Sequence, residues 1–270
     1  MFSDPPSWQT EAMSTIRGAR ERARIEVTAA IKDEARKQLA AEGAAKLSLR
    51  AVARELGMVS SALYRYFPSR DDLLTALIVD AYDAVGEAAE SARATGAAPG
   101  AAAHVGGGAG GGVRRAAASP AGPYLARWTA VACAVRDWAL AHPHEYALIY
   151  GSPVPGYIAP RDTVGPASRV GVVFIGLLRE AYRADGLAVP PLDGELRPEA
   201  ERMAADLAAD LPPAVVAALV AAWAQLFGLI SFELFGQFNR VVEARDVLFR
   251  HAVGELARSV GLTGSRAGTR

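Results

Sequence analysis

The stretch from Glu55 to Phe67, ELGMVSSALYRYF, places small side chains directly before polar aromatic ones. The small residues that open it after the glycine and methionine are Val59, Ser60, Ser61 and Ala62. Side chains of this size allow the end of a helix to approach the base edges of a duplex. Tyr64 and Tyr66 offer hydroxyl groups to phosphate oxygens, and Arg65 adds a positive charge. The stretch therefore predicts hydrogen bonds and ion pairs with a nucleic acid.

The residues that could act in catalysis or hold a metal lack the neighbours that such chemistry requires. Cys133, the one cysteine, lies in the apolar helical context WTAVACAVRDW, which predicts an inert buried thiol. His142 and His144 are two residues apart, so on a helix they point in different directions. Ser152 lacks the setting of a nucleophile elbow, and residues 106–112 lack the Lys-Ser/Thr of a phosphate-binding loop. We predict no enzyme activity, no metal site and no cofactor.

Local signals predict short helices that position these side chains. A helix from about residue 24 to 43 is indicated by apolar residues four apart, at Val27, Ile31, Ala35 and Leu39. Ser48 is a suitable N-cap for a second helix, which Gly57 ends. A third helix, from about residue 60 to 66, must stop before Pro68.

Ala53, Gly57 and Leu63 stand at offsets of 0, +4 and +10, a spacing typical of a helix-turn-helix. A small residue lets two helices cross closely, and a glycine accepts the unusual backbone angles of the turn. The second helix of this motif lies in the major groove of DNA. Flanking residues that could hold adjacent phosphates are Ser48, Arg50 and Arg70. The alternative is a plain three-helix packing motif whose arginines are only solvated.

The distribution of charge favours DNA binding, although the whole chain carries 29 basic and 29 acidic residues. Residues 14–70 contain 12 Lys/Arg and 6 Asp/Glu, which leaves 17 and 23 for the remainder. A basic N-terminal quarter on an acidic body predicts that this end of the molecule meets a polyanion.

The sequence LSLRAVARELGMVSSALYRYFPSRDDLLTAL resembles the DNA-binding domain of TetR-type transcriptional regulators, over about residues 20–80. The resemblance implies a dimeric repressor with helix-turn-helix heads and a helical ligand-sensing body. It also implies DNA contacts at the matching positions Ser48, Arg50, Ser60, Tyr64, Tyr66 and Arg70. Many members have His where this chain has Tyr66 and Lys where it has Arg70. Both residues present here still donate hydrogen bonds to phosphate.

We predict an all-α fold, because no segment shows the alternation of a strand. A three-helix helix-turn-helix DNA-binding domain would be followed by a helical ligand-binding and dimerisation domain. Ser69 and Asp72 resemble a capping box at the start of a connecting helix. Residues 96–112, eight of them Gly, predict a flexible linker. The expected divisions are a flexible tail at 1–20, the DNA-binding domain at 21–68, the connecting helix at 69–93, the Gly/Ala-rich linker at 94–122, the C-terminal domain at 123–262 and a disordered tail at 263–270.

The C-terminal half shows five further helical patterns, at residues 124–141, 143–150, 165–183, 212–238 and 246–260. No uninterrupted apolar run reaches the roughly 18–20 residues of a membrane span. The N-terminus, MFSDPPSWQTEAMST, is acidic where a signal peptide would be basic. A cytoplasmic protein without a membrane partner is therefore expected, with Met1 or Met13 as its first residue.

Aromatic and histidine residues recur every four positions before GSPVPGY, in a stretch that resembles the WHG C-terminal domain of some TetR-like regulators over about residues 124–185. Aromatic rings beside an irregular Pro/Gly segment suit a small apolar effector. The candidate ligand-binding residues are Trp128, Trp138, His142, Tyr146, Tyr150, Phe174 and Tyr182. Aromatic residues at helical spacing can equally form plain core, and His142, which precedes Pro143, can cap a helix end.

The segment 212–238 is apolar on nearly every side, so a helix there must be buried on two faces. The chain's own domain can cover one face, and a second copy the other. Together with the expected last helix, at residues 246–260, this segment predicts a two-fold dimer interface of four helices, two from each copy. The expected interface residues are Val220, Trp223, Ala224, Phe227, Ser231, Phe235, Leu248, Ala252 and Leu256. The alternative is the central helix of a monomeric bundle.

Together these features predict a repressor that binds palindromic operator DNA as a homodimer and is released by a small apolar or aromatic effector. Two other classes of protein share part of the pattern. An architectural DNA-binding protein would show no ligand-dependent release. A protein-interaction adaptor with a degenerate head would bind DNA with little dependence on salt.

Overall fold

The computed structural model describes residues 7–95 and 122–262, with side chains from Gly18 onward. Its regular secondary structure is helical, and the described residues form no strand beyond one isolated antiparallel bridge between Leu187 and Leu262. The predicted all-α fold is confirmed. The predicted linker lies outside the described residues except at its ends, as does the C-terminal tail.

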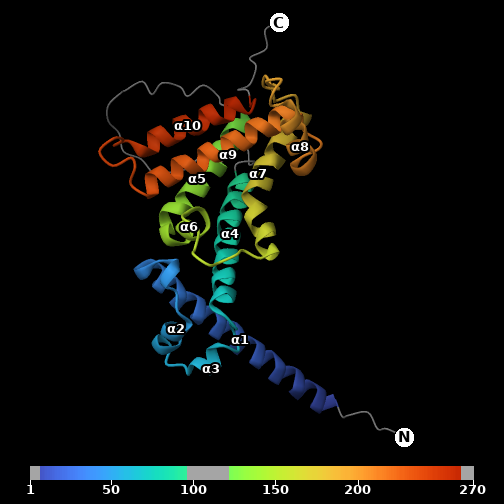
Figure 1. Ribbon diagram of the computed structural model, residues 1–270. Helices are drawn as coiled ribbons and strands as arrows, with labels where there is room; N and C mark the ends of the chain where they lie inside the picture. The colour runs from blue at the N-terminus through green and yellow to red at the C-terminus, as the bar shows by residue number, and fades with distance from the viewer. Residues whose placement is uncertain (1–6, 96–121, 263–270) are drawn as a thin grey trace, which may run out of the picture.

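The N-terminal domain is built from three helices and one short 3-10 turn (Figure 1). They are α1 (Ser7–Glu42), η1 (Ala44–Lys46), α2 (Leu49–Glu55) and α3 (Ser60–Leu63). Their shared core includes Ile31, Leu47, Val52, Leu63 and Phe67, all under a tenth exposed. The apolar spacing that predicted this motif therefore corresponds to side chains that meet in one small core.

Helix α1 begins far earlier than the sequence pattern suggested. A loose tail was expected up to residue 20, but the helix begins at Ser7, directly after Pro5 and Pro6. Proline is tolerated before a helix or in its first turn, so a helix that begins at Ser7 is compatible with the two prolines in the sequence before it. A helix can extend without an apolar stripe once a packed segment has nucleated it.

The predicted caps form as expected. The Oγ of Ser48 accepts a hydrogen bond from the Ala51 amide at 3.4 Å. The Oγ of Ser69 accepts one from the Asp72 amide at 3.1 Å and donates to the Asp72 carboxylate at 2.7 Å. Gly57 has a φ of 65°, which explains the glycine at the turn between α2 and α3.

Helix α4 (Arg70–Thr95) runs from the N-terminal domain into the body (Figure 1). Near its start, Leu73 and Leu77 pack in the core of the N-terminal domain. Further along, Val85 and Ala89 belong to the core of the body. One continuous helix therefore contributes to both cores, so a rotation of α4 in the body would also move the N-terminal domain.

The body contains six helices among the described residues, with η2 (Arg161–Thr163) before α7. They are α5 (Pro123–Ala141), α6 (Pro143–Tyr150), α7 (Val164–Arg183), α8 (Arg197–Leu207), α9 (Pro213–Leu234) and α10 (Arg245–Ser259). Helix α8 was not expected from the sequence. Helix α9 ends at Leu234 and not near Phe238, because Gly236 turns the chain with a φ of 85°.

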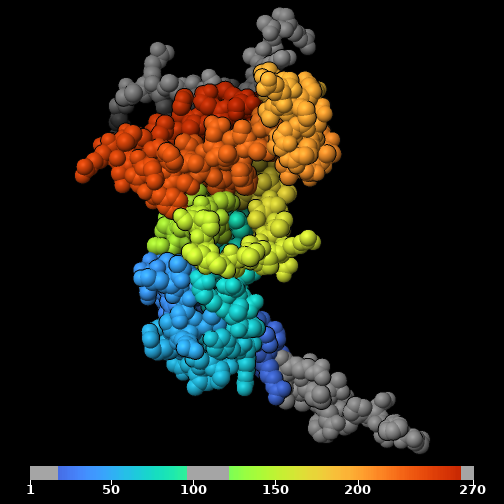
Figure 2. Space-filling view, in the orientation of Figure 1, coloured from blue at the N-terminus to red at the C-terminus, as the bar shows by residue number. Residues whose placement is uncertain are grey.

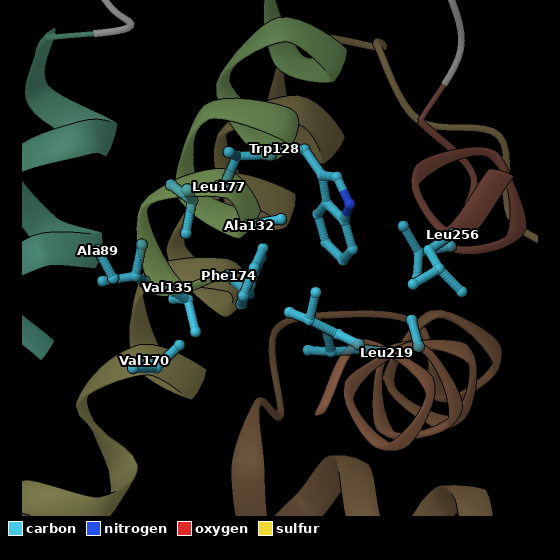
Figure 3. Close-up of a cluster of buried hydrophobic side chains, with 14 of the residues drawn as sticks. Ala89, Trp128, Ala132, Val135, Val170, Phe174, Leu177, Leu219 and Leu256 are labelled. Carbon is cyan, nitrogen blue, oxygen red and sulfur yellow. The ribbon is translucent and has the colours of Figure 1, made fainter. Parts of the chain in front are cut away.

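Trp128 and Phe174 lie in the largest buried cluster, with ring centroids 4.5 Å apart (Figure 3). Their neighbours come from α4, α5, α7, α9 and α10, and include Ala89, Leu177, Leu219 and Leu256. Helices α9 and α10 lie side by side at the end of the body opposite the N-terminal domain (Figures 1 and 2).

Helix α9 is long and apolar enough to span a membrane, with a mean hydropathy of 2.1 over its most apolar window. Length and composition are weak grounds for a span, because a core helix has the same properties. Leu226 and Ile230 are buried in the body, and Glu233 on the same helix is paired with Arg136. These contacts are those of a helix packed within a protein domain.

Candidate nucleic-acid interface and ligand site

The segment from Val59 to Tyr66 lies at the free end of the N-terminal domain, away from the body. Leu63 is fully buried and holds α3 against the core. Val59 is 70% exposed and Tyr64 is 42% exposed, while Ser60, Ser61 and Arg65 are also exposed. The predicted recognition residues therefore share an open surface, except Tyr66, which is half-buried.

The predicted phosphate contacts on α2 are also accessible. Arg50 is exposed and has no ion pair among the described residues. The oxygen of Ser48 serves as the helix cap, yet its hydroxyl hydrogen can still be donated to a phosphate. The nearby Arg54 is paired with Glu55 at 3.1 Å, so its charge is partly neutralised.

Arg70 has a structural role that the sequence did not reveal. Its guanidinium donates to the carbonyl oxygens of Ala44, at 2.8 Å, and Leu47, at 3.1 Å, and lies 3.3 Å from the Asp71 carboxylate. These bonds hold the η1 turn against the start of α4. The predicted phosphate contact of Arg70 remains a prediction, and it would have to share these donors.

Two arginines that the prediction left out lie beside the recognition segment. Arg20 and Arg24 of α1 line a surface hollow together with Arg65 and Tyr66. The guanidinium of Arg24 lies 6.0 Å from the centroid of the Tyr66 ring, within cation–π range. The missed signal was the row of arginines at residues 17–24, of which the sequence analysis assigned Arg17 and Arg20 to a tail.

The seven predicted ligand residues do not gather around one cavity. Trp128 and Phe174 form part of the closed core described above. Tyr146 is fully buried, and its hydroxyl donates to the Phe227 carbonyl at 3.1 Å. Tyr150 packs against Phe227 with ring centroids 4.2 Å apart, and burial raises the pKa of its phenol.

Of the remaining three candidates, Trp138 is buried and His142 and Tyr182 are exposed. The ring of Trp138 is stacked on that of exposed His142 at 5.3 Å. The Nδ1 of His142 lies 2.9 Å from the Trp138 carbonyl oxygen, at the C-terminal end of α5. This is the helix-capping role weighed as the alternative for His142. Tyr182 is 41% exposed.

One polar atom in the closed core has no partner among the described residues. The indole nitrogen of Trp128 is buried without a hydrogen bond to them, on a side chain that is 2% exposed. A buried donor left unpaired costs about 1–3 kcal/mol, so this N–H is a natural position for a hydrogen-bond acceptor. Figure 3 shows the indole directed between Leu219 and Leu256.

Two hollows flank the segment 151–155, where the body meets the N-terminal domain. One, of about 560 Å³, is lined by residues that include Leu39, His144 and Phe235. The other, of about 590 Å³, includes Tyr82 and Tyr157 in its lining. Neither contains any of the seven predicted ligand residues.

Ion pairs and hydrogen bonds join the two domains across this junction. Arg36 on α1 lies 3.8 Å from the Glu145 carboxylate on α6, and it also donates to Asp80, on the shared helix α4, at 2.7 Å. The hydroxyl groups of Thr75 and Tyr157 lie 2.8 Å apart. The N-terminal domain and the body are therefore linked by specific polar contacts in addition to the continuous helix α4.

The predicted dimer residues divide into two sets. Phe227 and Leu256 are 7% and 6% exposed and face the chain's own core, so they are not available on the surface of this subunit. Ser231 is half-buried and hydrogen-bonded to Tyr146 at 2.9 Å.

The outer face of α9 and α10 is nevertheless apolar. Val220 and Ala224 are exposed there, as are Phe232 at 52% and Val247 at 68%. Phe235 is also exposed, but it lies past the end of α9 and lines the hollow that includes Leu39 and His144. Trp223, Leu248 and Ala252 are half-buried. Exposed apolar side chains concentrated on two adjacent helices commonly mark a protein interface.

Most of the chain is similar in sequence to known transcriptional regulators. Residues 31–77 match the family model described as "Bacterial regulatory proteins, tetR family", and residues 128–256 match "Tetracyclin repressor-like, C-terminal domain". The chain is 38% identical over 229 residues to the HTH-type transcriptional regulators Rv1816 of Mycobacterium tuberculosis and Mb1846 of Mycobacterium bovis. This alignment covers 82% of the chain and 86% of each relative.

Solved structures share the same architecture. A regulatory protein designated SCO4313 is 33% identical, with a TM-score of 0.67, over 87% of this chain and 97% of that one. A protein from Rhodococcus sp. RHA1 is 22% identical, with a TM-score of 0.61, over 87% of this chain and 95% of that one. The second likeness shows the fold alone.

Proposed function

Since this chain belongs to the TetR family of transcriptional regulators, we propose that it is a cytoplasmic repressor that binds an inverted-repeat operator as a homodimer. A small apolar or aromatic effector would release it. The observation that carries the proposal is the pairing of an open, basic helix-turn-helix surface at one end with an exposed apolar face at the other.

The DNA contact is supported by the surface around α3. Tyr64 and Arg65 are exposed beside Ser60 and Ser61, and none of these four side chains is occupied by an ion pair or side-chain hydrogen bond among the described residues. Small residues would face the base edges, while the hydroxyl and guanidinium groups would hold phosphates.

The homodimer is supported by α9 and α10. A two-fold axis through their outer face would cover Val220, Phe232 and Val247, which the isolated subunit leaves exposed. It would also place two recognition segments on one side of the assembly, as an inverted repeat with half-sites about 34–36 Å apart requires.

For the effector we propose a site beside Trp128, reached when the core around it opens. An apolar molecule with one hydrogen-bond acceptor would pair with the free indole N–H and pack against Phe174 and Leu219. Such a ligand can shift the protein only if it binds two conformations unequally. A displacement of α7 or α9 would be transmitted along α4 to the DNA-binding domain.

Footprinting of the purified protein on its own upstream DNA, with and without a panel of small aromatic metabolites, tests the proposal. We expect protection of an inverted repeat that at least one compound abolishes. Protection that no compound alters would favour an architectural DNA-binding protein. Affinity for duplex DNA that barely changes between 50 and 200 mM salt would favour an adaptor, because phosphate contacts weaken steeply over about that range.

A further inference from the structure

Helix α1 continues well beyond the domain that it helps to build. Its first buried residue in the core of the DNA-binding domain is Ile31, and the residues from Ala19 to Glu26 are exposed. Figure 1 shows the N-terminal part of α1 projecting as a free rod away from the N-terminal domain. About 11 residues separate Arg20 from Ile31, which corresponds to roughly 16 Å of helix.

The face of α1 that packs on the core changes from apolar to basic residues where the helix extends past the core. Val27, Ile31 and Ala35 follow one another at the spacing of a single face. Toward the N-terminus, a step of three residues from Val27 and then one of four place Arg24 and Arg20 on that face. The face of α1 that packs on the N-terminal domain through apolar residues therefore carries arginine side chains nearer the N-terminus, where the helix extends past the domain.

These arginines share a hollow with the recognition segment. The hollow is about 760 Å³ and is lined by Gly18, Arg20, Glu21, Arg24, Arg65 and Tyr66. It contains three guanidinium groups and one carboxylate, so its charge is positive. An open, positively charged hollow continuous with a DNA-binding surface suits a phosphate backbone.

The arginines of the hollow also differ from most of those in the body in having no carboxylate partner among the described residues. Arg20, Arg24 and Arg65 have no salt bridge among the described residues. In the body, Arg136, Arg169 and Arg179 are each paired with a carboxylate at 2.8 Å or less. A charge without an internal partner remains available to an external one.

We infer that the N-terminal extension of α1 is a second DNA-contacting element, in which Arg20 and Arg24 hold backbone phosphates that flank the half-site read by α3. This inference rests on the proposed DNA binding. A rod of about 16 Å that follows the duplex would lengthen each half-site by up to roughly 5 base pairs, at 3.4 Å per pair. The added contacts are to phosphates and therefore independent of sequence.

The test uses the full chain and two duplexes defined by the footprint, one ending at the inverted repeat and one extended by 8–10 base pairs on each side. The wild type is expected to bind the longer duplex more tightly. The double variant R20Q/R24Q should lose this advantage and bind the short duplex as before. The salt slope on the long duplex should fall by about 0.9 for each phosphate contact removed.

Two substitutions on the same helix serve as controls. Arg22, which does not line the hollow, is exposed on another side of α1, so R22Q removes one charge without removing the proposed contact. Removing the carboxylate with E21Q should strengthen binding to the long duplex. Circular dichroism and thermal melting would show that each variant keeps its helix content.

The outcomes separate the two proposals. If the wild type binds neither duplex, the proposed DNA-binding function fails. If it binds both duplexes equally, or if R22Q loses the advantage of the longer duplex as fully as R20Q/R24Q does, the helix-turn-helix acts alone and the second contact is absent.

Discussion

Arg136 on α5 and Glu233 on α9 form a two-point ion pair inside the body, with both N–O distances at 2.7 Å and both side chains 8% exposed. Asp246 at the start of α10 lies 3.1 Å from the same guanidinium. The paired carboxylate raises the pKa of Arg136, so the guanidinium stays charged. One arginine thus connects the helices that carry the exposed apolar face.

Replacing Glu233 by Gln should destabilise the protein, because Arg136 would remain buried with a neutral partner. Removing one member of a buried pair typically costs about 3–5 kcal/mol, and Asp246 should keep the loss near the lower value. Urea denaturation would measure it. Glu199→Gln, which breaks an exposed pair with Arg202, is the control and should change the urea midpoint little. Equal effects of the two substitutions would contradict this role.

A second carboxylate makes stability depend on pH. The hydrogen bond from Arg127, and then that from Arg93, hold the pKa of Glu180 below its ordinary value of 4.5. A carboxylate whose pKa is lower in the folded state than in the unfolded state stabilises the protein at pH values above its unfolded-state pKa. This stabilisation is lost as the pH falls through the folded-state pKa. Its side chain is 38% exposed, so screening keeps the contribution modest.

Glu180→Gln should therefore lower stability at pH 7 and flatten its decline below about pH 4.5. Urea midpoints between pH 7 and pH 3.5 would measure both effects. Glu87→Gln, at an exposed residue of α4 with no ion pair among the described side chains, is the matched control. A Glu180 variant whose midpoints parallel those of the wild type over the whole range would refute the assignment.

The helix-turn-helix could be predicted from sequence because its signals are local. The Ser48 cap, the Gly57 turn and the Ser69 capping box each involve residues no more than four apart, and the structure contains all three. The body is different, since Arg136 and Glu233 are 97 residues apart and nothing in either local sequence indicates the other. Helix α8 was missed because only Ala200 and Ala204 are buried along it, which gives a weak apolar pattern.

The dimer residues show another limit of sequence analysis. When a helix is apolar on nearly every side, periodicity cannot tell which face its own domain covers. The prediction consequently placed Phe227 in the interface, whereas it packs on Tyr150, and it omitted Phe232, which is 52% exposed. The predicted ligand site had the same weakness, because rings at helical spacing form a core as readily as a pocket.

Phe232→Glu is expected to convert the proposed homodimer into monomers, since a charge in an apolar interface would be desolvated without a partner. Sedimentation at micromolar concentration would show the change in mass, and operator affinity should fall with it. Ile158→Glu is the control, because Ile158 is 88% exposed but lies on the loop between α6 and α7. If both variants keep the same mass as the wild type, the outer face of α9 is not the interface.

Tyr64→Phe removes only a hydroxyl from an exposed residue next to α3. The loss of one hydrogen bond to phosphate should weaken binding by about 1.5–3 kcal/mol per half-site at most, because the acceptor is charged. The effect should be similar for operator and random duplexes, as a backbone contact carries no sequence information. Fluorescence anisotropy would measure both, with Tyr182→Phe in the body as control. Unchanged affinity would remove Tyr64 from the DNA-contacting residues.

Trp128→Phe tests the effector site, because it removes the unpaired indole N–H and keeps an aromatic ring. The variant should bind operator DNA normally but require more effector for release, since the proposed acceptor would lose its donor. Trp138→Phe is the matched control on the same helix, as Trp138 is also buried but stacks on the exposed His142. Titrating the protein–operator complex with the effector found by footprinting would compare the two. A larger shift for Trp138→Phe would move the site toward the end of α5, and equal shifts would indicate that both rings serve only the core.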